Sequence, residues 1–352
     1  MTTRRLGVRA TAAVLAAVAA LGLLAPTATG QTPPTTIAPS GEAPAGQVEV
    51  HSWALTPASA PGAPASATRP YFSYNLAPGG TVEDAVTLFN YGNVQLTFRI
   101  YATDANNNED GAFDLLPGDQ APADAGSWVT IPQENITVPA QSQATVPITI
   151  NIPADARPGD HAGAVLASSQ AIGTGPDGKT VLTDRRTGSR LYIRVAGPLA
   201  PELTVEDIST EYTPGLNPAG GKTEISYRLV NRGNVRMSAS HSASVAGILG
   251  LGRKRAAGDD IPELLPGESV TVTASLDGVP ATGVVFTTVD LESAVIGEEG
   301  SPIIRSKRAM TLALPITVLA VLLAVGLALY ARRAYLRHRR SEQHLSVGPQ
   351  SL

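Results

Sequence analysis

Apolar and polar residues alternate along several short stretches in the middle of the chain. Val86 and Leu88 share one face of such a stretch, and Phe98 and Ile100 share one face of the next. A period of two places successive side chains on opposite sides of the backbone, so these stretches predict β-strands with one buried face.

One phrase of sequence links two such strands and occurs twice, as Asn90-Tyr91-Gly92-Asn93-Val94 and as Asn231-Arg232-Gly233-Asn234-Val235. Gly and Asn tolerate a positive φ better than other residues, and an Asn–Gly turn between alternating stretches is a strong hairpin signal. We therefore predict that each copy is a tight β-hairpin turn. The alternative is chance, because Asn–Gly turns are common.

Further similarities follow in the same order. The run 138–142 precedes a strand with Val146 and Ile148 on one face, and the run 265–269 precedes one with Val270 and Val272. Each strand then enters a Pro/Gly corner. An ordered series of matches predicts a duplicated β-domain. The first copy is longer between its repeated phrase and the following strand, and we expect the extra residues around 104–128.

The predicted fold class is therefore all-β, with two tandem immunoglobulin-like β-sandwich domains and one C-terminal transmembrane helix. The chain has 34 Gly and 28 Pro with only 5% aromatic residues, as expected for short strands joined by turns. We place the first sandwich at 47–197 and the second at 202–304, because Gly197-Pro198-Leu199-Ala200-Pro201 has the composition of a stiff linker.

The two ends of the chain have other compositions. Residues 1–30 combine early arginines, an apolar stretch and small residues before Gln31, which predicts a secretory signal peptide; an uncleaved anchor is the alternative. The Pro/Thr-rich segment 31–46 is expected to be a disordered spacer.

At the C-terminal end, residues 312–331 carry no charge and are long enough to span a bilayer. The basic tail 332–352 then predicts a single-pass protein with an external bulk and a cytoplasmic C-terminus.

Charge and cysteine content limit the function. Between Gln31 and Ile304 there are 15 Lys and Arg against 29 Asp and Glu, and this acidic balance argues against nucleic acid as a partner. The chain has no cysteine, which removes disulfides, thiolate metal sites and cysteine nucleophiles.

The sequence contains no recognisable catalytic constellation. The five histidines are scattered without metal-ligand spacing, and no Gly-x-Ser-x-Gly or phosphate-binding glycine motif occurs. His161 is a candidate base, but a surface-loop histidine is the preferred interpretation. We expect no enzyme activity and no cofactor, while an unrecognised carboxylate site is kept as an alternative.

One stretch has the oxygen side chains that a hard cation requires at alternate positions: Asp104, Asn106, Asn108 and Asp110. It lacks the glycine and the terminal acid of a calcium-binding loop, so a polar turn is the preferred interpretation and no metal is assigned. These four residues remain a weak calcium candidate.

Aromatic residues are concentrated in the first domain. Exposed rings can stack on sugars or anchor a protein partner, although rings in a sandwich often belong to the core. The candidate contacts with a glycan or partner are Trp53, Tyr71, Tyr74, Tyr91 and Trp128. The basic run Arg253-Lys254-Arg255 is a further candidate, for anionic lipid or wall polymer, with a solvated turn as the alternative.

The order of these features resembles the WxL-interacting proteins of Gram-positive bacteria. The resemblance is carried by Tyr71-Phe72 before Pro78-Gly79, the Asn90 turn, the loop from Asp104 to Gly111 and the corner from Pro153 to Gly163. It implies a peptidoglycan-binding β-domain, then a second domain described as host-binding, and a C-terminal anchor. The second domain here is a weaker match.

Together these observations predict a membrane-anchored cell-surface protein that binds peptidoglycan or a wall-associated protein without catalysis. The alternative is an accessory subunit of a secretion, adhesion or surface-assembly complex, in which a sandwich presents an edge strand or aromatic loop to another protein.

Overall fold

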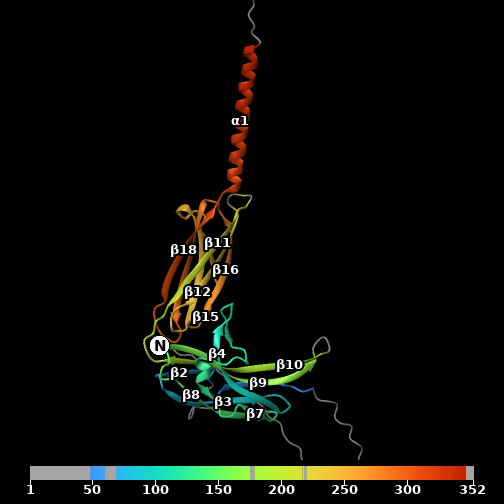
Figure 1. Cartoon of the computed structure of the whole chain (residues 1–352), viewed down its shortest axis with the longest axis vertical. Helices are drawn as coiled ribbons and strands as arrows, with labels where there is room; N and C mark the ends of the chain where they lie inside the picture. The colour runs from blue at the N-terminus through green and yellow to red at the C-terminus, as the bar shows by residue number, and fades with distance from the viewer. Residues whose placement is uncertain (1–47, 60–68, 175–178, 216, 218–219, 346–352) are drawn as a thin grey trace, which may run out of the picture. The chain divides into compact units, whose positions relative to one another are not determined.

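The computed structural model describes residues 48–59, 69–174, 179–215, 217 and 220–345 (Figure 1). The predicted signal peptide and the spacer 31–46 lie outside these residues. Within them the chain forms two β-sandwiches followed by one helix, so the predicted fold class is confirmed.

The first sandwich consists of two facing sheets. The order of the first sheet is β1 (Trp53–Pro57), β3 (Thr81–Asn90), β8 (Ser142–Asn151) and β6 (Val129–Thr130). The order of the second is β2 (Phe72–Leu76), β10 (Thr180–Val195), β9 (Gly159–Thr174), β4 (Leu96–Asn107) and β5 (Phe113–Leu115), with β7 (Asn135–Val138) also paired to β4. The short helix η1 (Ala125–Trp128) precedes β6.

The second sandwich repeats this arrangement with fewer strands. One sheet has the order β11 (Leu203–Thr213), β12 (Gly221–Asn231) and β16 (Ser269–Val279). The other has the order β14 (Lys254–Ala257), β13 (Met237–Gly247), β17 (Gly283–Val295) and β18 (Ile303–Ala313), with β15 (Ile261–Leu264) paired to β13. A one-turn helix, η2 (Ile248–Gly250), follows β13.

The strand order matches between the sandwiches. In the first sheets, the strand order β1-β3-β8 corresponds to β11-β12-β16. In the second sheets, the order β10-β9-β4-β7 corresponds to β18-β17-β13-β15. The alternating residues fill two separate cores: Val86, Leu88, Phe98 and Ile100 are buried in the first, and Tyr227 and Leu229 in the second. Burial of these apolar faces is the main stabilising contribution to each sandwich.

The repeated phrase is not a hairpin, contrary to the sequence prediction. β3 pairs with β1 and β8, whereas β4 pairs with β9, β5 and β7, so the turn carries the chain from one sheet to the other. The second copy likewise connects β12 in one sheet to β13 in the other. Each turn is therefore a β-arch, a connection between the two facing sheets of one sandwich: residues 90–94 form the first arch and residues 231–235 the second.

A buried asparagine holds each arch. The Asn90 side chain is 1% exposed; its amide donates to the carbonyls of Val94 (2.8 Å) and Val138 (3.0 Å), and its oxygen accepts from Gly92 N–H (2.9 Å). Asn231 makes the same three bonds, to Val235, Leu264 and Gly233 (2.8, 2.9 and 3.0 Å). The duplication therefore extends to individual hydrogen bonds.

The end of the second sandwich lies further along the chain than the sequence suggested. β18 continues past residue 304 to Ala313, because residues 309, 311 and 313 still alternate toward the core. The helix α1 (Ile316–Leu345) begins after Pro315 rather than at Leu312, and the carbonyl of Pro315 accepts the first helical bond from Leu319 N–H. Residues 316–337 are long and apolar enough to cross a membrane, by length and composition alone.

Candidate functional site

The extra residues of the first sandwich form a hairpin extension. β4 runs on to Asn107, turns at 108–111 and returns as β5. Gly111 has a φ of +79° and lies so close to β16 that a Cβ there would be 3.0 Å from Val270 Cγ2. Only glycine fits both the backbone and the space, and the turn thereby approaches the second sandwich.

Asn107 connects this extension to the second sandwich. Its amide donates to the carbonyls of Gly111 (2.9 Å) and Glu263 (3.0 Å), and its oxygen accepts from Leu265 N–H (2.8 Å). Because the side chain is buried, these bonds cannot be exchanged for water without cost. The insertion therefore links the two sandwiches.

The weak calcium candidate coincides with this extension. Asp104 is on β4 and accepts three backbone N–H groups, from Ala123, Asp124 and Gly126 (2.6, 2.8 and 2.7 Å). Asn108 accepts from the backbone of Asp110 and Ala112 within the turn. Asp104 and Asn108 use these oxygens to hold η1 and the β4–β5 turn, and Asn106 Oδ1 is buried without a hydrogen-bond partner. No cluster of three or more His, Asp or Glu residues suited to a metal occurs among the residues that the structure describes.

A buried carboxylate makes the second connection between the sandwiches. The Asp160 side chain on β9 is 2% exposed and accepts from Arg194 Nε (2.6 Å) and Nη2 (2.8 Å) and from the backbone N–H of Arg236 (2.7 Å). Its own N–H donates to the carbonyl of Asn234 in the second arch (2.7 Å). Arg194 also donates to Glu298 and to the Ile296 carbonyl.

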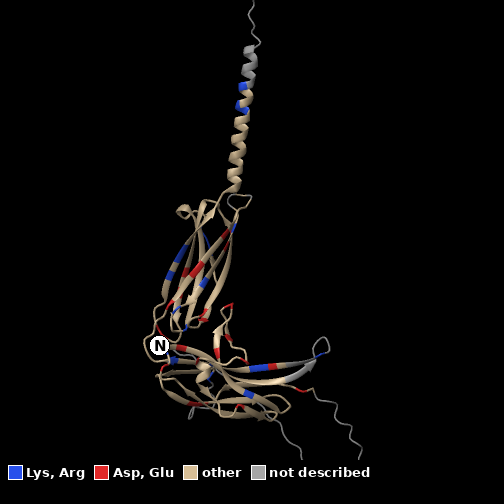
Figure 2. Ribbon diagram, in the orientation of Figure 1, with Lys and Arg blue, Asp and Glu red and all other residues tan. Residues whose placement is uncertain are grey.

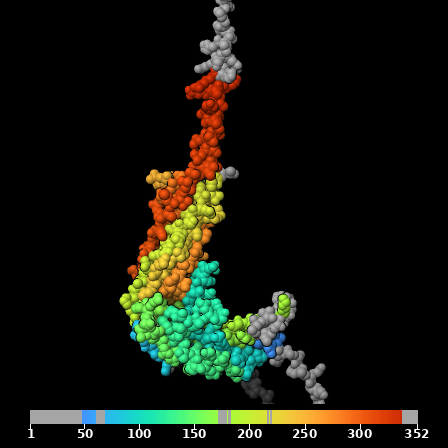
Figure 3. Space-filling view, viewed as in Figure 1, coloured from blue at the N-terminus to red at the C-terminus, as the bar shows by residue number. Residues whose placement is uncertain are grey.

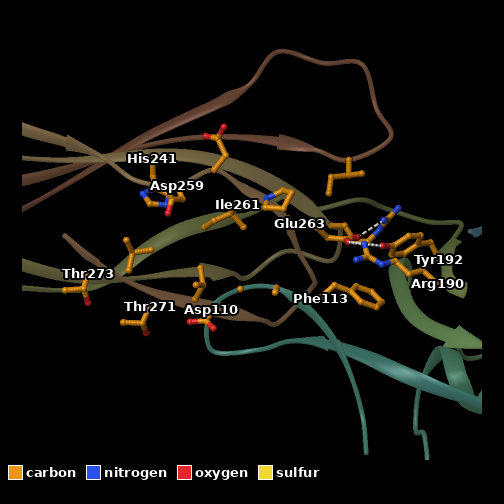
Figure 4. Close-up of a pocket in the computed structure, with 18 of the residues that line it drawn as sticks. Asp110, Phe113, Arg190, Tyr192, His241, Asp259, Ile261, Glu263, Thr271 and Thr273 are labelled. Carbon is orange, nitrogen blue, oxygen red and sulfur yellow. Dashed lines mark hydrogen bonds and ion pairs between the residues drawn. The ribbon is translucent and has the colours of Figure 1, made fainter. Parts of the chain in front are cut away.

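A cleft of about 690 Å³ opens where the two sandwiches meet (Figure 4). Its walls come from Tyr71, the β4–β5 turn and β10 on one side and from β15, β16 and residues 259–260 on the other. The volume is within the range of small-ligand sites.

Arginine and aromatic side chains alternate at one end of the cleft. The guanidinium carbon of Arg190 lies 4.1 Å from the centre of the Phe113 ring, and that of Arg236 lies 3.8 Å from the centre of the Tyr192 ring. Tyr71 meets Tyr192 edge to face at 5.4 Å. Cation–π contacts of this kind hold the rings and charges in fixed positions.

Glu263 neutralises part of this positive charge. It accepts from Tyr192 Oη (2.8 Å), Arg190 Nη1 (3.3 Å) and Arg236 Nη1 (2.8 Å), and dashed lines at Glu263 in Figure 4 mark contacts of this cluster. Burial, assisted by the Glu263 carboxylate, raises the pKa of Tyr192 to about 12, so its hydroxyl stays protonated as a donor. The Arg190 side chain is half exposed, whereas Asp110, Asp259 and Asp260 supply negative charge elsewhere on the lining.

The predicted aromatic contacts do not form one surface. Tyr71 is in the cleft and 45% exposed, whereas Tyr91 in the first arch is 54% exposed and stacks on Phe89. Tyr74 is partly buried and donates to Asp84, which also pairs with Arg69. Trp53 is partly buried against Phe98, with Arg185 over its ring.

Trp128 is 8% exposed and belongs to the first core, so its ring does not offer a face to a partner. It packs on His161 at 4.6 Å between ring centres. His161 is on β9 with a largely buried side chain rather than in a surface loop, and its two ring nitrogens lie 2.7 Å from Asp124 Oδ1 and 2.9 Å from the Arg157 carbonyl.

This histidine predicts a pH-dependent stability. Burial lowers the pKa of His161, but the Asp124 carboxylate and the Arg157 carbonyl outweigh it, and the net pKa is raised above 6.5. The protonated form therefore stabilises the fold below pH 6.5, and this contribution is lost as the pH rises through the folded-state pKa. We expect the free energy of unfolding of the wild type to fall with pH above 6.5 more steeply than that of His161→Gln. Parallel slopes in urea titrations would contradict the assignment.

The sequence reasoning missed Arg190, Tyr192, Arg236 and Glu263. A signal existed in β10, where Leu191, Ile193 and Val195 enter the core and the intervening positions 190, 192 and 194 therefore share the opposite face. Arg, Tyr and Arg in succession on such a face form a charged and aromatic surface. Glu263 and Arg236 come from distant strands and give no comparable local signal.

The fold is that of a tandem immunoglobulin-like protein with a C-terminal apolar helix, and the cleft lies between its two sandwiches. Residues 58–169, within the first sandwich, match the family model described as WxL Interacting Protein, peptidoglycan binding domain. This match confirms the family resemblance predicted from the sequence, over those residues. No curated protein matches the chain.

Solved structures that the chain resembles include chaperones. The YadV chaperone is 14% identical with a TM-score of 0.35, over 73% of this chain and 99% of that one. The chaperone–tip adhesion subunit pre-assembly complex CsuC-CsuE of Acinetobacter baumannii is 14% identical with a TM-score of 0.34, over 68% and 95%. The CupB2 chaperone of Pseudomonas aeruginosa is 11% identical with a TM-score of 0.31, over 69% and 97%. Likenesses at this level carry no functional argument.

Proposed function

We propose that this protein is a membrane-anchored bacterial surface protein whose first sandwich binds peptidoglycan, or a partner attached to it, without catalysis. The observation that carries the proposal is the match of residues 58–169 to a peptidoglycan-binding domain. The helix α1 supplies the anchor, because residues 316–331 carry no charge and none of the apolar window of the helix is buried in the protein.

The orientation follows from charge. Arg332, Arg333 and Arg337 lie toward the far end of α1, where Figure 2 shows Lys and Arg in blue, and further arginines follow them in the sequence. Basic residues are retained on the cytoplasmic side of a membrane, so both sandwiches are on the outer side. The anchor then holds the cleft within reach of the wall.

We assign wall binding to the cleft because its exposed groups suit this ligand. Peptidoglycan consists of sugar rings with short peptides that carry carboxylates. The exposed Tyr71 ring offers an apolar face for a sugar, and the half-exposed guanidinium of Arg190 offers paired donors for a carboxylate. Asp259 and Asp260 are exposed on the opposite wall, where amino groups of a peptide would be favoured.

Two substitutions test this assignment. Tyr71→Ala and Arg190→Ala are each expected to weaken co-sedimentation of the detergent-solubilised protein with purified sacculi by about fivefold to tenfold, because an anchoring contact contributes about 1 kcal/mol or more. Tyr91→Ala is the matched control, since Tyr91 is as exposed but lies outside the cleft.

Other outcomes change the proposal in different ways. If only Tyr91→Ala weakened binding, the site would be the first arch and not the cleft. If the wild type failed to sediment with sacculi while one surface protein co-purified, wall binding would be wrong and an accessory role in a surface-assembly complex would replace it. Release of soluble muropeptides during incubation would contradict the non-catalytic role.

A further inference from the structure

Three apolar side chains protrude from one loop of the second sandwich. The loop Gly247–Gly252 contains Ile248, Leu249 and Leu251, all exposed, and Leu249 is 96% exposed. In the space-filling view this segment projects, in orange, beside the red start of α1 (Figure 3). Apolar side chains gathered at the tip of a protruding loop indicate an interaction surface.

Strand register places this loop at the membrane end of the sandwich. Gly247 at the end of β13 is opposite Val285 of β17, and two residues earlier Gly283 is opposite Ala313 at the end of β18. Only Leu314 and Pro315 separate Ala313 from α1, a span of about 10 Å at most. The loop therefore lies close to the point where the chain enters α1.

The loop is held in a defined conformation. Gly247 N–H donates to the Leu251 carbonyl at 2.8 Å, which closes the turn, and Gly252 packs against Pro280. Leu249 has a φ of +59°. This conformation costs a leucine free energy that glycine or asparagine would avoid, and its exposed side chain gains no contact within the protein in return. A compensating contact with another molecule accounts for both features.

Basic residues follow the apolar ones directly. Arg253 and Lys254 are exposed at the start of β14, where Lys254 is opposite Val245 near the end of β13. An apolar tip with adjoining Lys and Arg is complementary to a bilayer surface, whose acyl region accepts the apolar groups and whose anionic headgroups attract the cations.

We propose that the loop Gly247–Gly252 inserts into the outer headgroup region of the bilayer that α1 crosses, with Arg253 and Lys254 on anionic headgroups. The loop and the helix together form two attachments, which restrict the tilt of the second sandwich on the membrane. This inference rests on the proposed membrane anchor.

The absence of cysteine makes a direct test possible, since a single introduced thiol can be labelled selectively. Leu249→Cys in the full chain is labelled with a polarity-sensitive fluorophore and reconstituted in phosphatidylcholine–phosphatidylglycerol vesicles. We expect blue-shifted emission, quenching by doxyl-labelled lipid and protection from aqueous iodide. Ser301→Cys is the control, because residue 301 is exposed in the β17–β18 turn, about 30 Å along β18 from the membrane end.

Flotation of the same vesicles separates the two proposals. If the protein fails to float with vesicles, the anchor is wrong. If it floats but the label at position 249 responds to iodide as the label at 301 does, the loop inference is overturned while the anchor stands.

A double substitution tests the contact of the basic residues with the headgroups. Arg253→Gln/Lys254→Gln, added to Leu249→Cys, is expected to reduce quenching of the label by doxyl lipid in vesicles that contain phosphatidylglycerol. Unchanged quenching would overturn the headgroup contact.

Discussion

Asn90→Ala is expected to lower the free energy of unfolding of the first sandwich by about 3 kcal/mol or more, because it leaves buried backbone groups of Gly92, Val94 and Val138 without partners. Asn231→Ala should have a comparable effect on the second sandwich, whose arch is held by the same bonds. These asparagines replace hydrogen bonds that strand pairing cannot supply where the chain leaves one sheet for the other.

The two tryptophans make this prediction measurable. Trp53 and Trp128 are both in the first sandwich, so their fluorescence follows that sandwich while circular dichroism follows both. In urea titrations of the detergent-solubilised protein, Asn90→Ala should move the fluorescence midpoint to lower urea. Asn93→Ala is the control: its oxygen accepts from Val50 N–H at 2.8 Å, and its side chain is exposed rather than buried. An equal shift for both variants would contradict the assigned role of Asn90.

The strands were predictable because alternation is a local property, but the topology at the arches was not. The phrase Asn-x-Gly-Asn fits both a hairpin and an arch, and the choice depends on whether the flanking strands pair with each other or with distant strands. A local signal was nonetheless present. Asn90 continues the inward series of Val86 and Leu88, so a polar side chain is placed in the core, where it can only cap backbone groups.

The cleft was predictable only in part. Tyr71 and the insertion after β4 were recognised as the features that distinguish the first domain from the second, and both line the cleft. The rest of the cleft depends on how the sandwiches contact each other. Arg190 gains its role from Phe113 and from Glu263 in the other sandwich, and such contacts between distant residues leave no periodic trace in a sequence.

Asp160→Ala is expected to cost about 3–5 kcal/mol, the usual effect of removing one partner from a buried ion pair. The substitution leaves the guanidinium of Arg194, only 17% exposed, without its two closest acceptor contacts, and it leaves the backbone N–H of Arg236 without its acceptor. Because Asp160 joins β9 to the second arch, the loss falls on the connection between the sandwiches. We expect the fluorescence and circular dichroism transitions, coincident in the wild type, to separate in the variant.

Glu298→Ala provides the matched control, because Glu298 pairs with the same arginine at 3.0 Å but is half exposed, and such pairs contribute little. Coincident transitions in Asp160→Ala, or an equal loss of stability in Glu298→Ala, would mean that the sandwiches are not coupled through this carboxylate.

The coupling between the sandwiches also affects binding. Since the cleft has walls from both sandwiches, separating them should weaken sedimentation with sacculi in Asp160→Ala although residue 160 does not line the cleft. A variant that uncouples the sandwiches and still binds fully would place the ligand on the first sandwich alone.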